Sequence, residues 1–174
     1  MALIVESGVG DPTAEALISI AEARAYADSH GLTLPESDTA VEVLCRLASE
    51  WLGGMESRLQ GYRRTANQAL TFPRVGISLY GREFTRYGSY LVNVLPEQVI
   101  PVDIKKALCQ LVYEMTLTDA NPTSDGKLVV SETVGPLTTT YQPTGVTPTP
   151  VFPKVLAFLA PFFKSPTGIN VTRA

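Results

Sequence analysis

An apolar stripe repeats at helical spacing between residues 38 and 60. Its members recur at i, i+3, i+4 and i+7, and they are Val41, Leu44, Cys45, Ala48, Leu52, Met55 and Leu59. This period is typical of one buried face of an amphipathic helix, and Ser37 or Asp38 stands where an N-cap is expected. We therefore expect a long core helix over 38–60. The pair Gly53-Gly54 inside it predicts a close helix contact or a kink.

Two further segments have the same period and well-marked ends. Ser19 and Glu22 are spaced as a capping box, and Gly31 is placed as the left-handed cap of a helix over 19–30. Pro101 opens a third helix over 101–118, since proline suits the first helical position. Three such helices predict a mainly α fold, a small helical bundle with an extended β-hairpin or ribbon and a C-terminal arm.

The second part of the chain has a different amino-acid composition. Residues 127–141 are rich in Val and Thr and flank Gly135-Pro136, which predicts a β-hairpin or ribbon. Residues 142–150 form a Thr/Pro stretch that favours extended backbone. We therefore expect a helical bundle with a basic and aromatic loop (61–98) within 1–120, and a ribbon, a Thr/Pro arm and an apolar segment within 121–174. That apolar segment either closes the core or docks on a neighbouring subunit, and the ribbon either stands alone or pairs with another chain.

Charge is unevenly distributed along the chain. Charged residues make up 18% of it and the net charge is −3, against a typical charged share of about 25%. Between residues 57 and 86, however, six arginines stand against one acid, Glu83, and aromatic residues lie among them. Three interpretations remain open: a strip for single-stranded nucleic acid, a protein interface, or a solvated loop whose aromatics complete the core.

Several classes of activity have little support. His30 is the one histidine and Cys45 and Cys109 are far apart, so metal-ligand spacing is lacking and two buried free thiols are expected. Asp119 and Asp125 are explained by turn chemistry. We expect no enzyme, no catalytic residue, no metal and no cofactor. No apolar run approaches the length of about 18 residues that marks a membrane span, so no membrane partner is expected.

Six short segments carry a resemblance to a known family. They are LIVESG at 3–8, ALISIAEA at 16–23, GYRR at 61–64, QALTFPR at 68–74, IPVDIKKA at 100–107 and VSETVGPL at 130–137. In this order they resemble the DnaT-like single-stranded-DNA-binding proteins of tailed phages, which are encoded among the head and head–tail joining genes. Phe72 departs from the pattern, which has Trp before Pro-Arg.

The resemblance implies a non-enzymatic virion protein. On its genomic setting we expect a head–tail connector adaptor, a ring of about a dozen copies that joins the portal to the tail around the DNA channel. Its partners would be the portal protein, the tail or next connector protein, neighbouring copies and, non-specifically, DNA. It would be assembled in the host cytoplasm and act at the head–tail interface of the virion. The alternative is a single-stranded DNA-binding protein in phage replication or packaging.

Two sets of residues are the candidates for these contacts. A recognition loop for portal or DNA would contain Arg63, Arg64, Phe72, Arg74, Arg82 and Arg86. An arm that binds the portal or an adjacent subunit would contain Val129, Val130, Val134, Leu137, Tyr141, Phe152 and Phe162.

Overall fold

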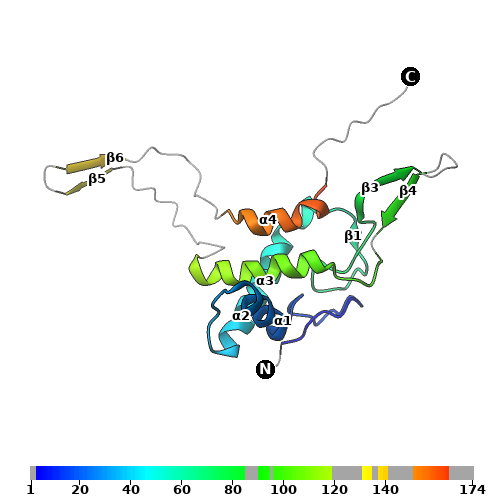
Figure 1. Cartoon of the computed structure of the whole chain (residues 1–174), viewed down its shortest axis with the longest axis horizontal. Helices are drawn as coiled ribbons and strands as arrows, with labels where there is room; N and C mark the ends of the chain where they lie inside the picture. The colour runs from blue at the N-terminus through cyan, green and yellow to red at the C-terminus, as the bar shows by residue number, and fades with distance from the viewer. Residues whose placement is uncertain are drawn as a thin grey trace, which may run out of the picture.

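The protein is mainly helical, as the sequence predicts. The structure is a computed structural model that describes residues 3–84, 90–94, 96–118, 131–134, 137–140 and 151–164. Figure 1 shows the helices gathered in one body. The helical elements are α1 (Ile20–His30), α2 (Asp38–Gly54), α3 (Val102–Leu117), α4 (Pro153–Leu159) and the two 3₁₀ turns η1 (Glu56–Arg58) and η2 (Ala160–Phe162). Among the described residues, no helix is long and apolar enough to span a bilayer.

The predicted caps of α1 are present. The Glu22 amide donates to Ser19 Oγ at 3.2 Å, and the Ser19 amide donates to Glu22 Oε2 at 2.8 Å. Gly31 adopts a left-handed φ of 64° and closes the helix by donating to the carbonyls of Ala27 and Asp28. Local spacing alone therefore fixed both ends of this helix.

The close helix contact predicted for the Gly53-Gly54 pair is not present. No neighbouring element approaches closely there, because a Cβ on Gly53 would meet only Thr71 Oγ1, at 3.7 Å, and one on Gly54 would meet nothing within 4 Å. Instead α2 ends at Gly54, and η1 follows after Met55. The single helix expected over 38–60 is thus a helix and a separate 3₁₀ turn. Ser37 occupies the N-cap position without a side-chain cap bond.

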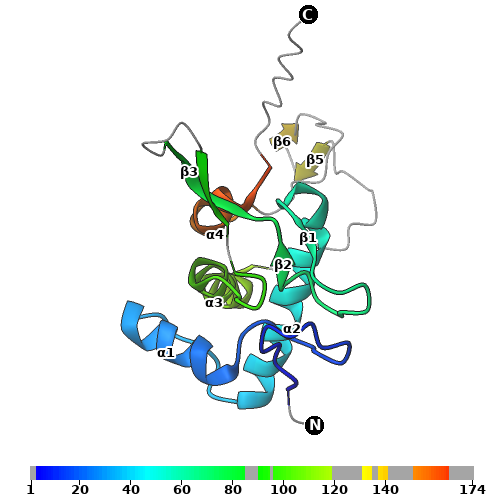
Figure 2. The ribbon, with the colours of Figure 1, turned by 90° about the vertical axis from the view of Figure 1, so that its right-hand side faces the viewer.

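The C-terminal apolar segment closes the core. Helices α1, α2 and α3 pack against one another, and α4 packs along α3 (Figure 2). Phe152 and Phe162 are buried in the same cluster as the helices. The Phe152 ring meets Trp51 at 5.9 Å between centroids, and Phe162 meets Phe72 at 6.4 Å, both edge to face. Of the two roles expected for this segment, the structure shows the one inside its own chain.

The strands form three separate antiparallel pairs. They are β1 (Tyr62–Arg63) with β2 (Arg74–Val75), β3 (Ser78–Phe84) with β4 (Tyr90–Val94), and β5 (Ser131–Val134) with β6 (Leu137–Thr140). The β5–β6 pair confirms the hairpin expected in 127–141. The β3–β4 pair is longer than the short strands expected in 61–98. Within the described part of the chain, β5 and β6 contact only each other.

Candidate nucleic-acid interface

Arg74 is held inside the molecule. Its guanidinium donates to three carbonyl oxygens, those of Gln60 (2.8 Å), Gly61 (2.7 Å) and Thr71 (3.4 Å), and to Glu56 Oε1 at 3.2 Å. The side chain is 3% exposed. Burial lowers the pKa of Arg74, and the hydrogen bond and charge of Glu56 oppose that shift. The fork-shaped guanidinium suits this site because it can donate in several directions at once.

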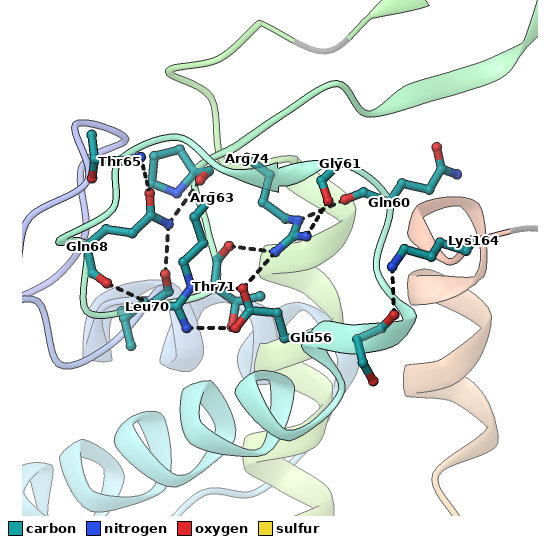
Figure 3. A network of polar contacts seen from close by, with 12 residues as sticks. Glu56, Gln60, Gly61, Arg63, Thr65, Gln68, Leu70, Thr71, Arg74 and Lys164 are labelled. Carbon is teal, nitrogen blue, oxygen red and sulfur yellow. Dashed lines mark hydrogen bonds and ion pairs between the residues drawn. The ribbon is translucent and has the colours of Figure 1, made fainter.

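Glu56 pairs with a second arginine beside the first (Figure 3). Arg63 donates to both carboxylate oxygens of Glu56, at 2.8 and 2.7 Å, and to the Gln68 carbonyl at 2.9 Å. This bidentate pair, together with Arg74, holds the pKa of the Glu56 carboxyl below its usual range. The buried Gln68 amide in turn donates to the carbonyls of Leu70 and Pro73. The network fixes the segment between β1 and β2 onto η1.

Arg64 joins this segment to the N-terminal loop. Its guanidinium donates to the carbonyls of Gly8 and Val9, each at 3.2 Å. That loop is organised by the buried Glu6 carboxylate, which accepts from the amides of Gly8 (2.7 Å), Gly10 (2.9 Å) and Asp11 (2.7 Å).

The predicted recognition loop is therefore directed largely inward. Phe72 and Arg74 are buried and support the fold, while Arg63 and Arg64 are partly exposed and bound to protein groups. The backbone of Arg82 lies in β3, and Arg86 lies outside the described residues. Among the predicted arm residues, Phe152 and Phe162 are buried in the core and Val134 pairs with Leu137 across the hairpin, whereas the others lie outside the described residues: Val129, Val130 and Tyr141.

A basic and aromatic surface does form, from residues that the prediction did not combine. The Arg58 guanidinium lies 4.7 Å from the centroid of the Phe163 ring. The Lys164 amide donates to the Arg58 carbonyl at 2.8 Å, and its Nζ donates to the Ser57 carbonyl at 2.9 Å. Tyr62, in β1, is 70% exposed. We call Arg58, Tyr62, Phe163 and Lys164 the η1 surface.

The η1 surface depends on contacts between distant parts of the chain. An antiparallel bridge joins Leu59 to Phe163, and the Gln60 amide donates to the Phe162 carbonyl at 2.8 Å. Arg58 belongs to the arginine-rich stretch of the sequence, but no local pattern connects it with Lys164. In the part of the chain that the structure describes, no three metal-ligating side chains cluster. The η1 surface itself supplies cations and aromatic rings.

Comparison with known proteins identifies a family for this chain. A family model described as "Putative DnaT-like ssDNA binding protein" matches residues 1–174. No curated protein and no solved structure matches. The family's description agrees with the alternative expectation, single-stranded DNA binding, and no comparison supports a connector role. Since the family model matches the whole chain, this protein belongs to the DnaT-like single-stranded-DNA-binding family.

Proposed function

We propose that this protein binds single-stranded DNA without sequence preference and that the η1 surface is the contact site. The observation that carries the proposal is the Arg58–Phe163 stack beside the exposed Lys164, with the exposed Tyr62 four residues after Arg58 in the chain. Proteins of this kind stack bases on aromatic rings and follow the phosphates with cations. The description of the family supports the same function.

The charges around this surface favour a polyanion. Glu56 lies in η1 together with Arg58, and it is neutralised by Arg63 and Arg74. Arg58 and Lys164 have no ion pair with another described residue, so their charges are available to phosphates. With two cations at this surface and a net charge of −3, binding should be weak at physiological salt and should tighten as salt is lowered with a log–log slope of about 1.4.

Fluorescence anisotropy of a labelled oligothymidylate, titrated at several salt concentrations, tests the proposal. Arg58→Ala and Lys164→Ala should each lower the log–log salt slope by about 0.7, the value for one lost contact to a single strand. Tyr62→Ala should weaken binding and leave the slope unchanged, because stacking involves no released ion. Arg24→Ala, which removes a cation on α1 paired with Asp38, is the matched control. No binding at low salt, or equal effects of Arg24→Ala and Arg58→Ala, would reject the proposal.

A second candidate is the head–tail connector adaptor, a ring that joins portal and tail. The observation that favours it is the β5–β6 hairpin, which contacts no other element in the described part of the chain. An isolated two-stranded hairpin is marginally stable in water, and β6 (Leu137–Thr140) has no charge that would protect its edge from another strand. Such a hairpin suits contact with a larger assembly.

The two candidates make different predictions for one deletion. Removing residues 131–140 should abolish co-assembly with the portal protein, measured as the mass of the complex, and should leave oligothymidylate binding unchanged. A wild-type chain that stays monomeric with portal protein present would reject the connector candidate and would leave the DNA-binding candidate standing.

A further inference from the structure

Helix α2 has an apolar outer face. Val43 is 51% exposed and Leu47 is 39% exposed, and Glu50 follows on the same face. Each of these residues stands two positions, or about 200° of helical rotation, beyond a buried residue of the stripe: Val41, Cys45 and Ala48. The face therefore points away from α1 and α3. Among the described residues, nothing in the chain covers it.

A groove of about 470 Å³ lies between α1 and the beginning of α3. Its apolar lining includes Tyr26, Ile100 and Val102, and Val102 is 63% exposed. Its charged lining residues are Lys105, Lys106 and Glu22. The groove is thus apolar with two cations and one acid beside it, whereas the α2 face is apolar with the acid Glu50 beside it.

The charges that are not strongly paired at these two places are opposite in sign. On α2, Arg46 is held by Glu15 and Glu42, and Glu50 forms no ion pair with another described residue. At the groove, Glu22 holds Lys105 at 2.6 Å. Lys106 is 48% exposed and has only Asp103, at 3.7 Å. One free acid and one weakly held cation therefore accompany the two apolar patches.

We propose that copies of this chain associate head to tail, with Val43 and Leu47 of one copy seated in the α1–α3 groove of the next. In this contact Glu50 meets Lys106 of the neighbouring copy. The α2 face points away from α1 and α3, whereas the groove lies between α1 and α3, so the two patches share no residue. Contact between unlike patches leaves one of each free and continues into a ring or a filament. Neither patch includes a residue of the η1 surface, so the proposal is independent of DNA binding.

Sedimentation velocity over a range of protein concentrations tests this contact. The wild-type chain should associate as its concentration rises. Val43→Asp blocks the α2 face and Val102→Asp blocks the groove, and each should raise the dissociation constant at least about tenfold. Leu117→Asp changes an exposed residue at the far end of α3, outside both patches, and should associate as the wild type does.

Mixing the two blocked variants distinguishes unlike from like contacts. Val43→Asp keeps an intact groove and Val102→Asp keeps an intact α2 face, so the mixture should form a 1:1 dimer and stop there. Glu50→Lys and Lys106→Glu should each weaken association, and the chain carrying both should recover it. A wild-type chain that remains monomeric at every concentration, a blocked variant that still associates alone, or a mixture without dimer would overturn the proposal. Unchanged helical circular dichroism would verify that each variant is folded.

Discussion

Arg74 donates to Glu56 across 3.2 Å, and this contact joins the turn that follows α2 to strand β2. The same guanidinium satisfies the carbonyls of Gln60, Gly61 and Thr71. Those carbonyls belong to the loop segments around β1 and β2, where regular sheet pairing is too short to satisfy them. The sequence predicts Arg74 in a basic recognition loop. In the structure its guanidinium instead makes the hydrogen bonds that a longer sheet would otherwise make.

Replacing Arg74 should therefore destabilise the fold. Arg74→Ala removes the guanidinium that donates to three carbonyls and one of the two arginines that pair with Glu56, and we expect it to lower the free energy of unfolding by about 3 kcal/mol. Arg74→Lys should recover little, because an ammonium cannot reach the same acceptors as a planar fork. Urea unfolding measures both. Arg24→Ala removes an exposed pair with Asp38 and should cost no more than about 1 kcal/mol. Equal losses in the Arg74 and Arg24 variants would show that the network is unimportant.

Glu56 should make stability depend on pH. Its two arginines, Arg63 first, lower the pKa of its carboxyl in the folded state below the ordinary 4.5. A carboxyl of this kind stabilises the fold fully above its unfolded pKa, and the contribution disappears as pH falls through the folded value. The difference in unfolding free energy between wild type and Glu56→Gln should be largest near pH 7 and shrink below about pH 4. A difference that is constant between pH 3 and pH 7 would contradict this.

The sequence predicted correctly those structural features that depend on residues close together in the chain. The ends of α1 follow from Ser19, Glu22 and Gly31, all within twelve residues of one another, and capping is a local interaction. The burial of Phe72 depends instead on the Phe162 ring, which is ninety positions later. The η1 surface requires the same long-range docking of residues 160–164. Hydrophobic periodicity does not show which distant segment packs against a given residue. We therefore predicted Phe72 and Arg74 as surface residues, whereas both are buried.

Glu6 holds the N-terminal loop in its conformation through hydrogen bonds. Its carboxylate accepts three backbone amides, from Gly8, Gly10 and Asp11. Glu6→Gln removes the charge and turns one acceptor into a donor that faces an amide. We expect a loss of about 2 kcal/mol in unfolding free energy. Glu97→Gln, in an exposed turn, should change stability by less than about 0.5 kcal/mol. If the two variants unfold alike, the loop is held by other contacts.

Both cysteine thiols should be unreactive in the folded protein. Burial raises the pKa of Cys45 to about 11 and that of Cys109 to about 12, and the thiolate is the reactive form. An aromatic disulfide reagent at pH 8 should label neither thiol in native buffer and both in urea. Rapid labelling of either one without denaturant would mean that α2 or α3 opens locally.

Three glycine-to-alanine variants separate steric collision from backbone strain. Gly8 has a φ of 102° and lies against Gln98, where a Cβ would collide with the carbonyl oxygen. Gly8→Ala combines the steric collision with backbone strain and should lower the free energy of unfolding by about 3 kcal/mol. Gly31 has a φ of 64° with open space around it, so Gly31→Ala has strain alone and should cost about 1 kcal/mol. Gly54 lies at the end of α2 with neither problem, and Gly54→Ala should be neutral or stabilise by up to about 1 kcal/mol. Thermal unfolding of the three proteins should give this order; a Gly8→Ala protein as stable as Gly31→Ala would show that residues 96–98 move aside freely.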